Sequence, residues 1–175
     1  MHAGDGFDSG VLDNGGLENN SPGQYPAEGS VSKSNEQYLL DRFWQPSPRL
    51  SEGRLLRDYA SAAIDISDGL LADLGHICEA SSVGAELTLA SIPLSVPLTE
   101  VMTQAEATKL ALTAGDDYEL CFTVPPEKVA GLESKINTGL LSARNIGEIV
   151  SGEHVKCLCS EGLTVDFPDG GYQHF

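Results

Sequence analysis

Three side chains that could do chemistry, Asp65, Ser67 and Asp68, stand together where an apolar β-branched run meets a glycine. A carboxylate inside an apolar strand is costly to bury without a partner, and a hard cation is a natural one. Mg²⁺ is usually held by one or two carboxylates together with the phosphates of a substrate. Asp65 and Asp68 therefore indicate a magnesium–phosphate site. The alternative is that Ser67 or Asp68 only caps the helix that follows.

The residues around this acidic turn predict a strand, a tight turn and a helix that would position it. Residues 62–66 form the apolar run, Gly69 permits the turn, and apolar residues recur at helical spacing from 70 to 78. The two carboxylates would then leave the carboxyl end of a strand, the edge at which open α/β sheets usually bind ligands. The N–H groups at the start of the helix would favour an anion nearby.

A second acidic loop, residues 113–117, leads into a predicted strand at 118–124. None of the lysines and arginines is adjacent in sequence to either acidic loop, and Arg57 is the nearest to Asp65. A carboxylate about 4 Å from a phosphate oxygen costs roughly 4 kcal/mol at an effective dielectric constant of 20. A nucleotide would therefore need Mg²⁺ between itself and these carboxylates. His76 follows Asp73 by one helical turn, and without a third ligand nearby a solvated Asp–His pair is the expectation.

Composition limits the classes of function. The chain has 175 residues, 41% of them hydrophobic, which is enough for one domain with a core. Its net charge of −16 argues against binding to nucleic acid or anionic membranes. No apolar run reaches membrane-spanning length, and the first residues lack the pattern of a signal peptide. The four cysteines lie in apolar contexts without C-x-x-C spacing, which predicts buried reduced thiols and a cytoplasmic protein.

The chain divides into two parts. Residues 1–35 are rich in glycine and polar residues without a persistent period, and we expect a mostly disordered or loosely attached arm. Residues 36–175 carry the periodic patterns. Helices are predicted at 37–43, 51–59, 69–80, 103–112 and 126–136, and strands at 62–66, 85–89, 118–124, 145–150, 154–159 and 163–167, with a proline-rich loop at 92–97. The predicted fold class is α+β, a mixed β-sheet packed with helices.

Four sequence blocks resemble the second domain of the thiamine-monophosphate kinase family. They are PSPR at 46–49, IDISDGL with ADLGHI at 64–77, GDDYELCF at 115–122 and GYQHF at 171–175. Their order and spacing agree with that family, and the resemblance covers residues 36–175. The family transfers the γ-phosphate of ATP to thiamine phosphate, which gives thiamine diphosphate. It belongs to the superfamily of aminoimidazole ribonucleotide synthetase and selenophosphate synthetase, which binds ATP without a P-loop.

The resemblance also implies roles for individual residues. Asp65 and Asp68 match Mg²⁺ ligands, and Ser67 matches a contact to ATP. Asp116 and Tyr172 match contacts to the substrate, whose cationic thiazolium ring would be attracted by a carboxylate and by an aromatic face. The resemblance assigns no catalytic residue in this chain, because phosphoryl transfer needs mainly positioning and charge neutralisation.

The sequence departs from the family pattern in two places. The middle loop usually reads Gly-Gly-Glu-Asp and here reads Ala114-Gly115-Asp116-Asp117, so the Asp116 carboxylate reaches one methylene less far. The family's N-terminal domain, which supplies most metal and ATP ligands and the homodimer interface, has no counterpart in these residues. We therefore expect half of an enzyme, inactive unless a separate N-terminal domain complements it. The alternatives are a non-catalytic remnant that binds a ligand or partner, and another ATP-using synthetase of the superfamily.

Overall fold

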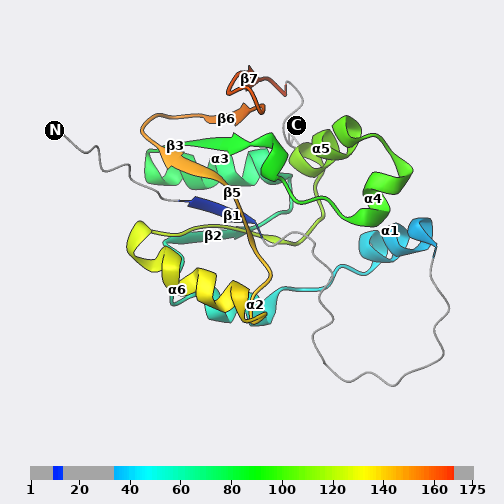
Figure 1. Cartoon of the computed structure of the whole chain (residues 1–175), viewed down its shortest axis with the longest axis horizontal. Coiled ribbons are helices and arrows are strands. Elements are labelled where there is room, and N and C mark those ends of the chain that lie inside the picture. The colour runs from blue at the N-terminus through cyan, green and yellow to red at the C-terminus, as the bar shows by residue number, and fades with distance from the viewer. Residues whose placement is uncertain (1–9, 14–33, 168–175) are drawn as a thin grey trace.

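Helices cover both faces of a mixed β-sheet in the computed structural model, which describes residues 10–13 and 34–167. In Figure 1, α2 and α6 lie below β1 and β2, and α3 lies above these two strands, next to β3. Helices α1 and α4 stand beside one another at one end of the sheet. This arrangement confirms the predicted α+β class.

The sheet has seven strands in the order β2-β4-β1-β5-β3-β6-β7. Strands β3 and β6 pair in parallel, and the other neighbouring pairs are antiparallel. The strands are β1 (Gly10–Asp13), β2 (Ala62–Asp65), β3 (Gly84–Thr88), β4 (Leu120–Thr123), β5 (Arg144–Val150), β6 (Val155–Leu158) and β7 (Thr164–Val165). Strand β2, which leads to the acidic turn, is therefore an edge strand.

Strand β1 comes from the part of the chain expected to be a loosely attached arm. Residues 10–13 insert between β4 and β5 and pair antiparallel with both. Four residues are too few to show a period, so the sequence pattern did not indicate this strand. The expectation of a disordered arm is wrong for these four residues. Residues 34 and 35 are the N-cap and the first residue of helix α1 (Asn35–Trp44). The other residues of the predicted arm, 1–9 and 14–33, lie outside the described residues, and the division at residue 35 stays a prediction.

The five predicted helices are present with ends shifted by a few residues. The helices are α1 (Asn35–Trp44), α2 (Leu50–Leu56), α3 (Leu70–Ser81), α4 (Val96–Val101), α5 (Gln104–Thr113) and α6 (Pro126–Asn137), with a 3-10 turn at Leu89–Ser91. Helix α4 was not predicted, and its first two residues, 96 and 97, were assigned to the proline-rich loop. The Ser95 side chain accepts a hydrogen bond from the backbone N–H of Leu98, and Pro97 lies in the first turn, where its missing N–H does no harm.

Two apolar clusters form the core, one on each face of the sheet. Leu70, Leu74 and Cys78 of α3 pack against the sheet on one face, and Leu56 and Leu132 pack on the other. The cysteines are free thiols, as predicted, and Cys159 is the one that is partly exposed. Among the described residues, no helix combines the length and apolar character needed to span a membrane.

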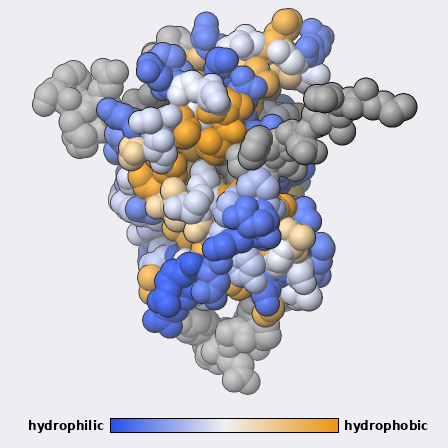
Figure 2. Space-filling view, turned by 90° about the vertical axis from the view of Figure 1, so that its left-hand side faces the viewer, coloured by the Kyte–Doolittle hydropathy of each residue, from blue (hydrophilic) through white to orange (hydrophobic). Residues whose placement is uncertain are grey.

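The acidic turn lies at one end of the molecule. Strand β2 passes into α3 on the right-hand side of Figure 1, next to α5, α4 and α1. Figure 2 shows the opposite end, where an apolar area is bordered by hydrophilic residues. The acidic turn therefore lies away from the surface seen in Figure 2.

Candidate acidic active site

The two acidic loops lie side by side. Beyond the ends of β2 and β4, the backbone ladder continues: Ile66 N–H donates to Glu119 O at 2.8 Å, and Tyr118 N–H donates to Ile66 O at 2.8 Å. Asp116 N–H donates to Ser67 O at 2.9 Å. Because β2 and β4 are antiparallel, the carboxyl end of one meets the amino end of the other. Blocks that are about 50 residues apart in sequence thus form one acidic site.

Two glycines permit this close approach. A Cβ atom on Gly115 would lie 2.2 Å from Ser67 O, which no side chain can tolerate. Gly69 has φ +107°, and a Cβ there would lie 2.9 Å from the backbone C and O of Thr113. Because neither glycine has a side chain, the turn at 67–69 can lie directly against the loop at 113–116.

The acidic turn is fixed by Asp73 and not by its own side chains. Gly69 is the N-cap of α3, and no side chain caps the helix there. Asp73, only 2% exposed, accepts hydrogen bonds through Oδ2 from Ser67 N–H at 2.9 Å and from Asp68 N–H at 3.0 Å. The interpretation of Ser67 or Asp68 as a helix cap is therefore wrong. Within the described part of the chain, their side chains make no hydrogen bond.

Asp65 is exposed at the end of edge strand β2. The inference that its carboxylate is buried is wrong, because an edge strand leaves alternate side chains open to solvent. Asp65 lies close enough to Tyr118 for its negative charge to contribute to raising the pKa of that phenol. The largest cause of that raised pKa is the hydrogen bond from Tyr118 Oη to Asp116 Oδ1, 2.9 Å long. Asp65 and Asp116 thus both lie near Tyr118.

Asp68, Asp73 and His76 form a group whose potential ligand atoms lie within 4.8 Å of one another. The Asp–His pair was expected to be solvated and to lack a third ligand. Instead Asp73 is buried, and the preceding turn brings Asp68 to the pair. Two carboxylates and an imidazole are donors that suit a divalent cation. Asp65 is not a member of this three-residue group.

Two arginines reach the second acidic loop, although no basic residue is next to it in sequence. Glu119 is 7% exposed and accepts a two-point hydrogen bond from Arg49, with Nε at 2.8 Å and Nη2 at 2.6 Å. Arg42 Nη2 also contacts Glu119 Oε1. The hydrogen bond and charge of Glu119 raise the pKa of Arg49. The second acidic loop therefore has basic neighbours in space, although it has none in sequence.

The arginines come from α1 and from the segment before α2. Arg42 is in the last turn of α1, and Arg49 follows the two prolines of the PSPR block and precedes α2. Prolines at 46 and 48 keep this connection extended. The PSPR block therefore has a structural role that the sequence alone did not reveal, as an anchor for a buried glutamate. The available signal was Glu119 itself, an acidic residue at the start of an apolar strand.

Asp117 has a strongly shifted pKa. Desolvation by surrounding atoms is the main cause, and the charge of Glu119 adds to it, so the pKa of Asp117 rises to about 6 although part of the residue is exposed. The positive charge of Arg42 lowers that pKa, and the charge of Asp116 raises it. Asp117 thus changes charge closer to neutral pH than an ordinary carboxylate.

Asp116 and Tyr118 have left-handed backbone conformations, with φ of 64° and 52°. Such φ values are uncommon outside glycine, and they cluster at functional sites. Asp116 is exposed, and its carboxylate is oriented by the Tyr118 hydroxyl. Tyr172, the other predicted substrate contact, lies outside the described residues.

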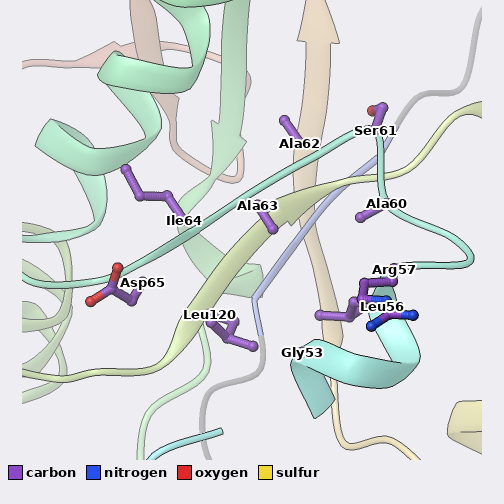
Figure 3. Close-up of a pocket in the computed structure, with 10 residues that line it drawn as sticks. All are labelled: Gly53, Leu56, Arg57, Ala60, Ser61, Ala62, Ala63, Ile64, Asp65 and Leu120. Carbon is purple, nitrogen blue, oxygen red and sulfur yellow. The ribbon is translucent and has the colours of Figure 1, made fainter. Parts of the chain in front are cut away.

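A groove runs along the edge strand towards Asp65. It has a volume of about 430 Å³ and is lined by Gly53, Leu56, Arg57, residues 60–65 and Leu120. Figure 3 shows Asp65 at one end and Arg57 at the other, with Ala63 and Leu120 between them. The groove therefore opens directly onto one of the two predicted Mg²⁺ ligands.

Comparisons with known proteins find relatives over most of the chain. The family described as AIR synthase related protein, C-terminal domain, matches residues 22–160. Thiamine-monophosphate kinase of Escherichia coli (strain K12) is 41% identical over 138 residues, which cover 79% of this chain and 42% of that protein. The enzyme of the same name from Haemophilus influenzae is 37% identical over 149 residues, 83% of this chain and 45% of that protein. The chain thus spans less than half the length of these curated relatives.

Solved structures of similar proteins have the same fold. Thiamine-monophosphate kinase from Stenotrophomonas maltophilia K279a matches with a TM-score of 0.73 and 32% identity over 87% of this chain and 50% of that chain. AaThiL complexed with AMPPCP and TMP matches with a TM-score of 0.70 and 27% identity over 98% of this chain and 53% of that chain.

Proposed function

The chain belongs to the family of AIR synthase related proteins through their C-terminal domain, and from this premise we propose that it is the C-terminal part of a thiamine-monophosphate kinase. The activity proposed for the complete enzyme is transfer of a phosphoryl group from ATP to thiamine phosphate. The curated relatives named above are thiamine-monophosphate kinases, which favours this activity over another synthetase of the superfamily. The observation that carries the proposal is the joining of the two acidic loops by backbone hydrogen bonds.

Asp65 and Asp68 would hold Mg²⁺ in this site, and Ser67 would contact ATP. Carboxylate oxygens are suitable ligands for Mg²⁺, and the side chains of Ser67 and Asp68 are not used as helix caps. Mg²⁺ would supply neutralisation of phosphate charge, without which the clustered carboxylates would repel a triphosphate. The backbone of the turn, fixed by Asp73 and Gly115, would keep these side chains in place.

Asp116 and Tyr172 would contact thiamine phosphate. The Asp116 carboxylate is exposed, and its negative charge would attract the cationic thiazolium ring. The hydrogen bond from Tyr118 limits the rotation of the Asp116 carboxylate. AaThiL complexed with AMPPCP and TMP is a structural neighbour, which supports ligands of these two kinds.

We infer that these 175 residues do not transfer phosphate by themselves. Two aspartates cannot surround a triphosphate, and the remaining ligands would come from an N-terminal domain. The homodimeric assembly and the cytoplasmic location implied by the resemblance are part of the same proposal. The opposing hypothesis is a remnant that folds and binds a ligand without catalysis.

The test is complementation. The purified chain is assayed for thiamine diphosphate formation, alone and with the separately produced N-terminal portion of a thiamine-monophosphate kinase, in the presence of ATP and Mg²⁺. We expect no product from the chain alone and measurable product from the mixture. The mixture with Asp65→Asn and the N-terminal portion by itself are the controls. Product formation by the chain alone, free of host enzyme, would overturn the two-part proposal, and ligand binding without product in the mixture would favour the remnant.

A further inference from the structure

Asp73 is a buried carboxylate whose side-chain hydrogen bonds, among the described residues, go to the acidic turn. It lies in α3, and its own N–H donates to Gly69 O at 3.0 Å. Its Oδ2 accepts the N–H groups of Ser67 and Asp68, the two residues before the N-cap. A buried charge is stable only when such donors satisfy it, so these two hydrogen bonds are strong constraints on the turn.

The backbone of the turn is held from two sides. Asp73 binds both N–H groups, and on the other side Asp116 N–H donates to Ser67 O at 2.9 Å. Gly115 lies against the same carbonyl so closely that a Cβ would reach it at 2.2 Å. These contacts leave the turn little freedom, while the Asp68 side chain has no hydrogen-bond partner within the described residues.

We propose that Asp73 is a positioning residue for the divalent-cation site: it holds the backbone of Ser67 and Asp68 so that the Asp68 carboxylate is presented to the cation. This inference rests on the proposed function, which makes Asp68 a Mg²⁺ ligand. The alternative role for Asp73 is direct ligation, because its carboxylate lies in one group with Asp68 and His76. Positioning requires only an oxygen that accepts two N–H groups, whereas ligation requires the negative charge.

Two substitutions separate these roles. Asp73→Asn removes the charge but keeps an amide oxygen that can accept both N–H groups. Asp73→Ala removes the acceptor altogether. Loss of a residue that orients a metal ligand typically weakens affinity by about 10- to 100-fold. Asp68→Asn is the positive control. Glu79→Gln is the matched negative control, because it also removes one negative charge from α3, at an exposed position.

The experiment is a titration of the full chain with Mn²⁺, which substitutes for Mg²⁺ and broadens NMR signals of nearby amides. We expect Asp73→Ala and Asp68→Asn to bind Mn²⁺ at least about 10-fold more weakly than the unmodified chain, with Asp73→Asn and Glu79→Gln within about threefold. Asp73→Ala binding as tightly as the unmodified chain would overturn the inference. So would an equal loss in Asp73→Asn and Asp73→Ala, which would assign Asp73 as a ligand.

Amide hydrogen exchange without metal provides a readout that is independent of the proposed function. The amides of Ser67 and Asp68 should be protected in the unmodified chain and in Asp73→Asn, and exposed to exchange in Asp73→Ala. Unchanged protection of Leu74 in the core shows that the variant is folded. Fast exchange of the two amides in the unmodified chain would overturn the positioning role of Asp73 and leave the proposed function unaffected. Protected amides without any Mn²⁺ binding would overturn the metal assignment of the proposed function, and the cation role of Asp73 with it.

Discussion

At the scale of single residues, the site combines carboxylates of very different environments. Asp65 and Asp116 are exposed. Asp73 is buried and accepts hydrogen bonds from backbone N–H groups, and Glu119 is buried and accepts hydrogen bonds from two arginines. Carboxylates near one another stay ionised only where such donors or a cation compensate the repulsion. The identity of each partner therefore decides which carboxylate is free for a ligand.

Asp65 should be dispensable for folding and necessary for cation binding. Its exposed side chain makes no hydrogen bond within the described residues, so Asp65→Asn should change the free energy of unfolding by less than about 0.5 kcal/mol. If Asp65 is a Mg²⁺ ligand, product formation in the complemented mixture should fall at least about 10-fold, and added Mg²⁺ should recover part of it. Urea unfolding and a Mg²⁺ titration of the activity measure the two effects. Activity near the unmodified level at all Mg²⁺ concentrations would refute the assignment.

Asp117 should make stability depend on pH in the acidic range. Its pKa in the folded chain is about 6, above the ordinary value of 3.8. Between these values the folded state binds more protons than the unfolded state, so stability rises as pH falls from about 6 towards 4. Asp117→Asn should raise Tm near pH 7 and flatten the dependence over that range. Thermal unfolding at several pH values measures this, and an unchanged pH profile in the variant would contradict the prediction.

Glu119 should contribute both to stability and to the titration of Asp117. Glu119→Gln leaves two arginines without their carboxylate and should cost about 1.5–3 kcal/mol of unfolding free energy, the range for hydrogen bonds to charged groups. Because the charge of Glu119 raises the pKa of Asp117, that pKa should fall in the variant. NMR titration of Asp117 gives the second quantity, with the distant Glu127→Gln as control. A pKa that stays at about 6 would show that desolvation alone sets it.

At the scale of elements, the sequence predicts the helices and strands whose hydrophobic periods extend over several residues. It does not predict burial or pairing that depends on where an element lies in the fold. The strand–turn–helix around Asp68 follows from an apolar run, a glycine and helical spacing. The burial of Asp65 was judged wrongly, because the sequence does not show that β2 is at the edge of the sheet. The pairing of Arg42 and Arg49 with Glu119 spans at least 70 residues, a separation that no local pattern encodes.

The contact between the acidic loops should depend on Gly115. An alanine Cβ would lie 2.2 Å from Ser67 O, a backbone atom that Asp73 and Asp116 hold in place, so the loop must separate from the turn. Overpacking of this kind costs about 1–3 kcal/mol. Gly75→Ala in the interior of α3 is the matched control, since nothing lies within 4 Å of its Cβ position and alanine favours a helix by about 1 kcal/mol. Urea unfolding should show a lower free energy of unfolding for Gly115→Ala and a higher one for Gly75→Ala. A Gly115→Ala variant as stable as the unmodified chain would contradict the close approach.

At the scale of the whole molecule, the sheet is continuous only because residues 10–13 lie between β4 and β5. Among the described strands, β2 and β4 have no backbone pairing with β5, β3, β6 or β7 except through β1. The acidic site lies on the same side of β1 as β2 and β4, and the other four strands lie on the opposite side of β1. Integrity of the site should therefore depend on a segment whose composition is typical of a disordered arm.

Proline substitution in β1 tests this dependence. Val11 pairs with Thr123 of β4 and with Gly147 of β5, so it is in a central strand, where proline removes a backbone donor and disrupts the ladder. Loss of roughly three backbone hydrogen bonds at about 1 kcal/mol each should lower Tm by about 6–12 °C. Thr164→Pro in β7, an edge strand, is the control and should have a smaller effect, because proline is tolerated at sheet edges. A chain with Val11→Pro that melts like the unmodified chain would show that β2 and β4 keep their place without β1, and that the arm is dispensable as its composition predicts.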